Sequence, residues 1–440
     1  MDVGISYLIV TSEIALFCVV VFLIAKYCGL LSFQGLFAGY NLILAVSDWI
    51  GLSITMMQGG EGLPFAMSEE LAMRITPLFL QLVGFIIFFG GVRLVPNWSR
   101  NLQKMSDERL SKIWSSVSKV VILGFGLLFL GYYFCGVTSY KYFLTEMNKL
   151  AFSVKKYEFL IVLGTDFAFV SGGLLVACSK NKILAFLEAI FLVVAAVVLT
   201  TSKSGFQIAL VPIVVGIGIF RPQWAKSFLK IKYILAAVVL FVWVLGVKTQ
   251  LRYQSTVDYH PSAVTEAASS TLARRFGPEG LFRGYCQMVD SIKSNPILRG
   301  NGTTLYYGFA SMVPRFIWPD KPDHPMRGLG YLTNASGIVD ENAANTLTAV
   351  GMWYWDYGFW GMALGMLVTG FWTGFLQNFL VKRSSTLSFM LARIFFAQAG
   401  LNHGGPIYLG RDILEILTFI FLGWLFSVIR LPNLSIEKKA

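Results

Sequence analysis

The stretch that decides the fold lies near the middle of the chain, where residues 183–200 read ILAFLEAIFLVVAAVVLT. Its one charged side chain is Glu188, and an apolar run of roughly 18 residues or more is long enough to cross the hydrocarbon layer of a bilayer as a helix. Comparable runs follow on both sides of it. The sequence therefore predicts an all-α polytopic membrane protein with about 11 transmembrane helices, at residues 5–25, 35–57, 75–95, 118–138, 159–178, 183–200, 206–220, 232–247, 357–380, 386–401 and 412–430.

The composition excludes an ordinary soluble protein. Of the 440 residues, 55% are hydrophobic and 14% are charged, whereas soluble domains average about 45–50% and about 25%. The net charge is +12, and the five cysteines form neither a disulfide framework nor a Cys/His metal-binding spacing. We read the first apolar run as a transmembrane helix, because no basic segment precedes it as in a signal peptide.

Basic residues in the short connections predict the orientation, because cytoplasmic loops carry an excess of Lys and Arg. Basic clusters at 96–119, 221–232 and the C-terminal end fall on one side of the membrane if the N-terminus lies outside. The segment 139–158 disagrees, because its four lysines then lie on the external side. This topology places the C-terminal tail, residues 431–440, in the cytoplasm.

The one long polar segment, residues 248–345, then faces outward, since long loops are translocated regardless of their charge. It contains ten basic and eight acidic residues and several prolines, a pattern typical of short helices and turns. We expect it to lie as a lid over two groups of membrane helices, about eight within residues 1–247 and about three within residues 346–430.

Three polar clusters on the external side are candidate sites. The first is the hydroxyl-rich turn 200–205 with Lys203, which could bind an anionic oxygen or be a tight turn with a lysine reaching the interface. The second consists of cations of the long segment, whose arginines suit phosphate oxygens: Arg252, Arg274, Arg275, Arg315 and Lys321. These cations could instead pair with the acidic residues of the same segment, or contact anionic lipid.

The third cluster lies between the last two predicted helices and includes His403, Arg411 and Asp412. Histidine titrates near neutrality, so His403 could move a proton, or it could simply cap a helix. Asp340 and Glu341 are alternative carboxylate bases. Acidic residues inside apolar runs would suit a proton-coupled carrier instead: Glu13, Asp48, Asp166, Glu188 and Glu415.

Three segments carry a family resemblance. The run Pro314-Arg315-Phe316-Ile317-Trp318-Pro319-Asp320-Lys321-Pro322 resembles the signature of the Wzy-type polymerases, which polymerise O-antigen and other oligosaccharide repeat units in bacterial inner membranes. Thr201-Ser202-Lys203-Ser204-Gly205 and Asp356-Tyr357-Gly358-Phe359-Trp360-Gly361 resemble two further family segments, with Lys203 where arginine is more usual. The resemblance covers about 25 residues of motif.

The resemblance implies a GT-C-like membrane fold and transfer of a growing glycan from undecaprenyl pyrophosphate to a second lipid-linked repeat unit on the periplasmic face. The residue chemistry fits this reaction, and we assign the base to His403, with Glu341 in reserve, and place Arg315 at the reaction centre. Substrate binding then falls to Arg252, Arg274, Arg275, Arg315, Lys321, Lys203, Arg411 and His324. No metal, cofactor or nucleic acid is implied, whereas membrane lipids and a chain-length regulator protein are implied partners.

Several alternatives stay open. An O-antigen ligase would use the same donor with a different acceptor, and a capsule or exopolysaccharide polymerase would differ in the repeat unit. A flippase for lipid-linked oligosaccharides also needs cations for pyrophosphate, but in a cavity open to both faces. A scaffold of an export complex would need none of these cations.

Overall fold

The computed structural model describes residues 3–58, 63–95, 105–137, 158–200, 205–224, 242–250, 258–276, 281–311, 317–322, 348–402 and 405–428, together with Val239 and Val313. Every regular element in these ranges is helical. The elements are α1 (Val3–Cys28), α2 (Phe33–Gln58), α3 (Leu63–Arg93), α4 (Asp107–Phe134), α6 (Glu158–Cys178), α7 (Lys182–Leu199), α8 (Gly205–Phe220), α11 (Pro261–Phe276), α12 (Leu281–Ser294), the 3₁₀ turn η1 (Pro296–Leu298), α13 (Thr303–Ser311), α15 (Ala349–Arg383), α16 (Leu387–Asn402) and α17 (Pro406–Val428).

Within the described ranges, seven helices are long and apolar enough to cross a membrane, namely α1, α2, α3, α4, α6, α7 and α15. The apolar parts of α8 and α16 are shorter. The prediction of a helical, polytopic, membrane-embedded protein is therefore confirmed at this coarser level. Most of the span expected at 232–247 lies outside the described residues.

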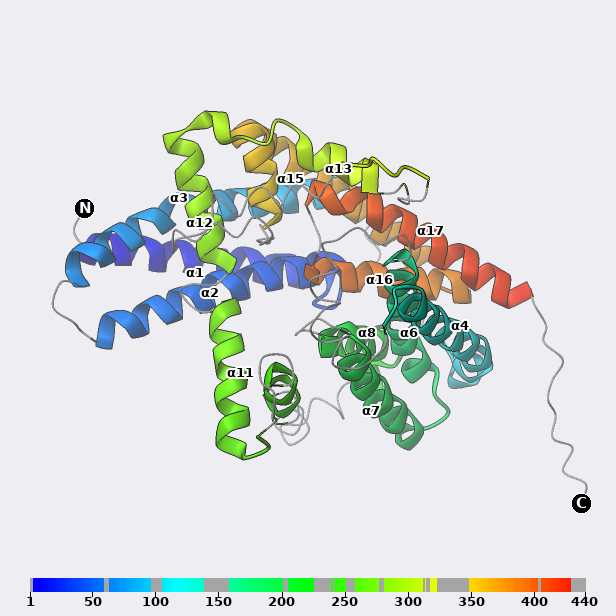
Figure 1. Cartoon of the computed structure of the whole chain (residues 1–440). Helices are drawn as coiled ribbons and strands as arrows, with labels where there is room; N and C mark the ends of the chain where they lie inside the picture. The colour runs from blue at the N-terminus through cyan, green and yellow to red at the C-terminus, as the bar shows by residue number, and fades with distance from the viewer. Residues whose placement is uncertain are drawn as a thin grey trace, which may run out of the picture.

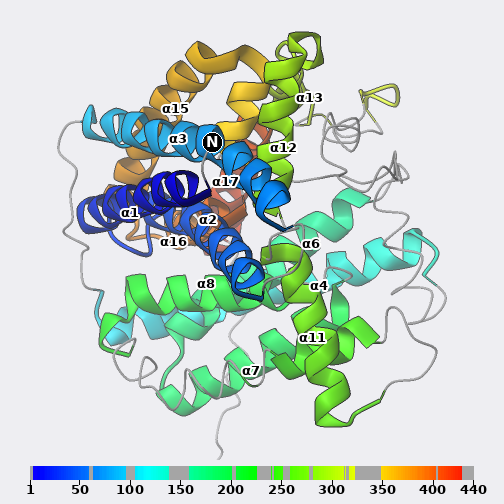
Figure 2. The same cartoon turned by 90° about the vertical axis from the view of Figure 1, so that its left-hand side faces the viewer.

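The membrane helices form two groups joined by α16 (Figures 1 and 2). In the first group α1 packs against α2 and α3, and α3 packs along α15. In the second, α6 packs against α4, α7 and α8. Because α16 contacts α2 on one side and α6, α8 and α17 on others, it connects the two groups.

Glycine lets two of these helix pairs approach closely. A Cβ atom at Gly124 of α4 would lie 2.2 Å from the backbone nitrogen of Ala168 in α6, and one at Gly370 of α15 would lie 2.1 Å from the carbonyl oxygen of Phe88 in α3. Small residues at such crossings allow the backbones of two membrane helices to touch. Close packing of this kind drives helix association in a membrane, because lipid tails are as apolar as the side chains and the hydrophobic effect does not favour helix–helix contact. Substitution at either position would push the two helices apart.

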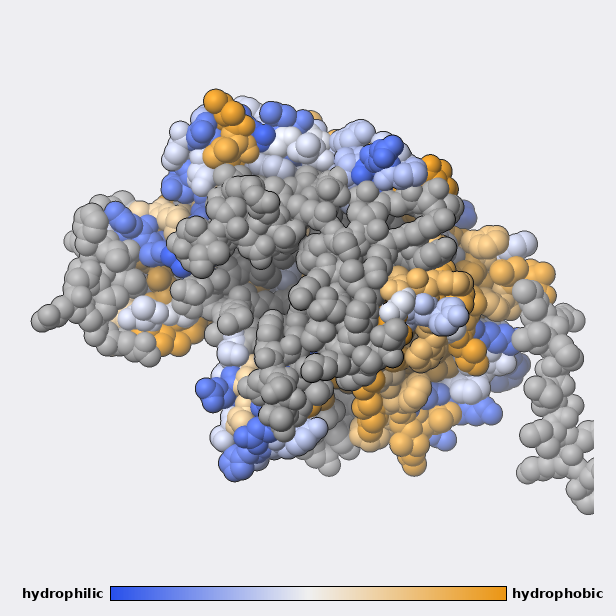
Figure 3. Space-filling model, in the orientation of Figure 1, coloured by the Kyte–Doolittle hydropathy of each residue, from blue (hydrophilic) through white to orange (hydrophobic). Residues whose placement is uncertain are grey.

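The exterior of the membrane helices is apolar, as a lipid-facing surface requires. Large apolar side chains are exposed along α7, including Ile183 at 76% and Phe191 at 61%. Figure 3 shows hydrophobic residues gathered over the helices at the lower right, whereas the top shows hydrophilic residues around a smaller hydrophobic cluster and the region of α11 at the bottom left shows many hydrophilic residues. The described helices of the polar segment thus differ in surface from those predicted to lie in lipid.

The helices of the polar segment pack on the membrane helices rather than forming a separate core. α12 contacts α2, α3 and α15, and α13 contacts α15 and α17. The inner face of α12 is buried, with Tyr285 and Cys286 both at 0% exposure, and the Tyr285 hydroxyl donates to the carbonyl oxygen of Pro77 in α3 at 3.2 Å. The helix α12 is therefore held against α3 and α15.

Candidate functional site

The candidate site is the junction between α13 and a break in α15. Gly358 interrupts α15 with φ 68° and ψ −159°, outside the helical region. Glycine adopts a positive φ without the steric cost that a Cβ atom brings. Residues 349–357 therefore form a short first helix, and the second half of α15 takes a new direction toward Arg383.

The turn that precedes α13 is docked on this break. The indole Nε1 of Trp355 donates to the carbonyl oxygen of Leu298 at 2.8 Å, and the backbone N–H of Gly300 donates to the carbonyl oxygen of Trp355 at 3.1 Å. The approach is so close that a Cβ atom at Gly300 would lie 2.4 Å from Oδ1 of Asp356. Backbone and side-chain hydrogen bonds together thus fix the position of the turn on α15.

Asp356 joins α13 to the same break. Its Oδ2 atom accepts hydrogen bonds from the backbone N–H of Thr304, at 3.2 Å, and from the hydroxyl of Thr304. A carboxylate at the first turn of a helix satisfies N–H groups that have no partner within the helix. Asp356 is 2% exposed and its carboxylate is occupied by the hydrogen bonds from Thr304. These contacts indicate that Asp356 positions α13 and does not transfer a proton.

Lys321, a predicted substrate-binding residue, contacts α13 as well. Its Nζ atom donates to the carbonyl oxygen of Val313 at 3.1 Å and lies 5.8 Å from the centroid of the Tyr307 ring. The backbone N–H of Val313 in turn donates to Ala310, near the end of α13, at 3.1 Å. The described parts of the segment 313–322 therefore fold back onto α13.

The start of α17 reaches the same region. Gly405 lies so close to α15 that a Cβ atom there would be 2.4 Å from the sulfur of Met352, one turn before Asp356. α13 also packs on α17. The structure thus brings together residues 298–311, Lys321, residues 352–358 and Gly405. The sequence analysis had treated Lys321, Asp356 and the connection before the last helix as separate features.

Most of the other predicted site residues lie outside the described part of the chain: Lys203, Arg252, Arg315, His324, Glu341 and His403. Arg274 and Arg275 lie in α11 and Arg411 lies in α17, where the backbone is described and the side chains are not. Their assignment to substrate stays a prediction.

Thr200, at the start of the first predicted cluster, has an internal partner. The Nζ atom of Lys248 donates to its carbonyl oxygen at 2.8 Å and to its hydroxyl at 3.3 Å, and Lys248 is 5% exposed. This contact links the end of α7 to the helical stretch 242–250. In the described residues it lies apart from the contacts that join α13 to α15.

A buried ionic network beneath α12 was missed by the sequence analysis. Arg74 of α3 binds the carboxylate of Asp48 in α2 through Nε at 2.6 Å and Nη2 at 3.1 Å, and its Nη1 binds Glu70 at 2.5 Å. Arg283 of α12 donates to the other oxygen of Glu70. Arg74 and Asp48 are 1% and 2% exposed, whereas Glu70 and Arg283 are 25% and 22% exposed.

Two of the five acids that the proton-carrier alternative would use have internal partners. Asp48 is held by Arg74, and Glu188 accepts hydrogen bonds from Trp114 Nε1, at 2.8 Å, and from the Ser179 hydroxyl. A sequence signal for the network did exist: Glu70 and Arg74 are spaced i,i+4, the spacing of helical ion pairs. Its partners Asp48 and Arg283 lie too far away in sequence to be paired by spacing.

Cys286 lies beside this network on the buried face of α12. Complete burial raises the pKa of its thiol well above the ordinary value, an effect that the nearby Arg74 only partly offsets. Burial likewise raises the pKa of the neighbouring Tyr285 hydroxyl. The Cys286 thiol is therefore protonated and unreactive at neutral pH while α12 stays in place.

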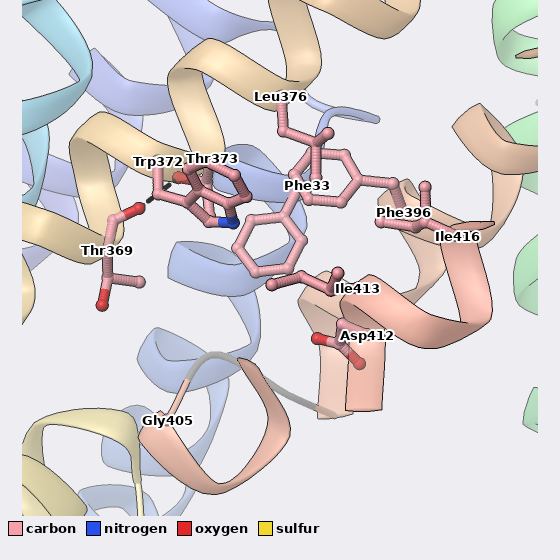
Figure 4. Close-up of a pocket in the computed structure, with 10 residues that line it drawn as sticks. All are labelled: Phe33, Thr369, Trp372, Thr373, Leu376, Phe396, Gly405, Asp412, Ile413 and Ile416. Carbon is pink, nitrogen blue, oxygen red and sulfur yellow. Dashed lines mark hydrogen bonds between the residues drawn. The ribbon is translucent and has the colours of Figure 1, made fainter. Parts of the chain in front are cut away.

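A small cavity lies deeper along α15 (Figure 4). The ten lining residues come from α2, α15, α16, α17 and the connection before α17: Phe33, Thr369, Trp372, Thr373, Leu376, Phe396, Gly405, Asp412, Ile413 and Ile416. The Thr373 hydroxyl donates to the backbone carbonyl of Thr369 at 2.7 Å instead of to the cavity. With a volume of about 20 Å³ the cavity has room for a water molecule, and it is too small for a sugar.

Among the described residues, no three His, Cys, Asp or Glu side chains gather closely enough to hold a metal ion. Comparison with protein-family models, with curated proteins and with solved structures finds no match to this chain.

Proposed function

We propose that this chain is a polysaccharide polymerase of the bacterial inner membrane. It joins oligosaccharide repeat units carried on undecaprenyl pyrophosphate, at the periplasmic face, and it has about 11 transmembrane helices in a GT-C-like arrangement. The repeat unit belongs to O-antigen or a related surface polysaccharide. A chain-length regulator protein is an expected partner.

One observation carries the proposal furthest: α13 joins two segments that resemble the same polymerase family. Lys321, near the end of the first segment, lies over Tyr307 of α13, and Asp356, at the start of the second, accepts from Thr304 of α13. The two segments are separated by more than 30 residues in sequence. Their meeting on one short helix is expected if both contribute to a single site.

Glycan transfer from a lipid-linked donor suits a site outside the cytoplasm, because no nucleotide sugar is available there and the donor must arrive on a lipid. The acceptor hydroxyl attacks the anomeric carbon of the donor, and the bond from that carbon to the pyrophosphate oxygen breaks. The proton passes to a base, for which His403 is proposed with Glu341 in reserve. Cations stabilise the negative charge that develops on the leaving pyrophosphate, and Arg315 is the proposed central one.

The test is reconstitution of the purified chain in lipid with a synthetic undecaprenyl-pyrophosphate repeat unit as sole substrate. Products separated by size should form a ladder spaced by one repeat unit, with release of undecaprenyl pyrophosphate. Arg315→Gln should lower the rate by about a hundredfold or more, the scale of losing one donor to a developing charge.

Arg383→Gln is the matched control, because Arg383 is an exposed arginine at the far end of α15 whose guanidinium stacks 4.5 Å from the Phe379 ring. Its ladder should match that of the wild type. In a second reaction that also contains lipid A core, transfer only to that acceptor would assign the chain to the ligases. Movement of intact substrate across the bilayer without a ladder would contradict the proposal in favour of a flippase.

A further inference from the structure

Arg299 is an exposed arginine in the turn that docks on the break in α15. Its neighbours on both sides are held in place, since the carbonyl oxygen of Leu298 accepts from Trp355 and the N–H of Gly300 donates to Trp355. The backbone N–H of Arg299 itself donates to Pro296 at 3.3 Å. The backbone that carries this guanidinium is therefore fixed relative to α15.

The guanidinium of Arg299 lies flat over Gly358. Three of its atoms are nearly equidistant from the position that a Cβ atom would take at Gly358: Cζ at 3.3 Å, Nη2 at 3.3 Å and Nη1 at 3.5 Å. Equal distances to one point mean that a face of the planar group, and not its edge, rests on the glycine. Because the N–H donors of arginine lie in that plane, they are directed away from Gly358.

Within the described ranges these donors have no protein partner. Among the described residues, no hydrogen bond or ion pair is formed by the Arg299 side chain, in contrast to Arg74 and Arg283 in the network under α12. A planar fork with free donors matches two oxygens of a phosphate. Because its backbone is held and its guanidinium packs on Gly358, less entropy is lost on binding such a ligand.

The surface around Gly358 is suited to a phosphate that carries a lipid chain. Tyr357, Phe359 and Trp360, next to Gly358 in sequence, are 44%, 39% and 81% exposed. Exposed aromatic side chains of this kind occur where a membrane helix meets the headgroup layer. A cation and an apolar aromatic surface thus lie side by side at one point of α15.

We propose that Arg299 binds a phosphate oxygen of the polyprenyl pyrophosphate, with the lipid chain leaving along the aromatic surface of Tyr357, Phe359 and Trp360. This assignment rests on the proposed function and adds a substrate-binding residue to it. Gly358 is needed for two reasons, the positive φ and the space that the guanidinium occupies. Arg299 is a binding residue here and takes no proton.

The experiment measures equilibrium binding of undecaprenyl pyrophosphate to the full chain in nanodiscs of phosphatidylcholine. Arg299→Gln should weaken binding by about tenfold to a hundredfold, the range for a lost charge-assisted hydrogen bond. Arg299→Lys should retain part of the affinity, because it keeps the charge and loses the fork. Arg383→Gln should bind like the wild type, and thermal unfolding of each variant should be unchanged because both side chains are exposed.

Two further arms separate the sources of the phosphate. Undecaprenol, which lacks the phosphates, should bind equally weakly to wild type and Arg299→Gln. Replacement of phosphatidylcholine by phosphatidylglycerol makes the headgroups anionic and should weaken binding of undecaprenyl pyrophosphate only slightly. Complete loss of that binding would assign the site to anionic lipid headgroups and overturn the substrate assignment.

Equal binding of undecaprenyl pyrophosphate to wild type and Arg299→Gln would overturn the role of Arg299 while leaving the polymerase proposal intact. A wild type that binds no undecaprenyl pyrophosphate and makes no ladder would overturn both.

Discussion

Glu70 links α12 to the ionic network in the membrane helices, and its neutralisation gives a sharp test of the structure. One of its oxygens accepts from Arg74 and the other accepts from Arg283. When α12 moves away from α3, the contact to Arg283 breaks, whereas Arg74 keeps both bonds to Asp48. The Glu70–Arg283 contact is therefore the part of the network that opposes opening of α12.

The magnitude follows from the kind of contact and its exposure. A hydrogen bond to a charged group contributes about 1.5–3 kcal/mol, and the lower end applies because solvent screens a pair that is about a quarter exposed. A loss of about 1.4 kcal/mol from the closed form raises the equilibrium constant for opening of α12 tenfold. Glu70→Gln should therefore raise the fraction of chains with α12 open by about a factor of ten.

Cys286 reports this opening directly, since its thiol is completely buried on α12 and protonated in the closed form. The rate of maleimide labelling, measured on the peptide that contains Cys286 by mass spectrometry, should rise about tenfold in Glu70→Gln. Arg283→Gln should have a similar effect, and the double variant should add little to either because both remove one contact.

The matched control is Glu69→Gln, which removes the same charge from an exposed neighbour on the same helix. Its labelling rate should equal that of the wild type. A Glu70→Gln rate that also equals the wild-type rate would refute the conclusion that the pair holds α12, and an equal rise in Glu69→Gln would show that only the net charge matters.

Two further predictions concern single positions. Gly358→Ala should lower the free energy of unfolding by about 1–3 kcal/mol, because φ 68° with ψ −159° is a conformation that is essentially restricted to glycine. Gly126→Ala should slightly raise it, because Gly126 lies within α4 and a Cβ there meets no atom within 4 Å. Denaturant titration in detergent checks both, and equal effects would contradict the break in α15. Arg393→Met should leave the unfolding temperature unchanged or raise it. Arg393 is 4% exposed and its Nε and Nη1 atoms have no hydrogen-bond partner among the described residues, so the substitution removes the cost of burying an unpaired charge. A clear decrease would show that a bound molecule or another segment satisfies this guanidinium.

The candidate site was only partly accessible to sequence reasoning. The motif segments containing Lys321 and Asp356 stand out by their residue types, and Asp48 stands out as an acid in an apolar run. That Asp356 holds α13, and that Asp48 pairs with Arg74, depends on contacts between different helices. The same holds for Arg299, which no motif marks and whose environment is set by Gly358 of a distant helix.

The sequence by itself determined that this protein is helical and embedded in a membrane. A run such as residues 183–200 is enough to predict a membrane helix. In lipid the backbone hydrogen bonds must be formed within the segment, which requires a helix, and the side chains must be apolar. Only the tertiary structure decided which polar residues meet, because α13 brings Lys321 and Asp356 together across a long separation in sequence. Hydrophobicity places a helix in the bilayer, but all membrane helices are similarly hydrophobic and this property does not select one neighbour over another. Close contacts at glycine and a few buried hydrogen bonds determine which helices pack together.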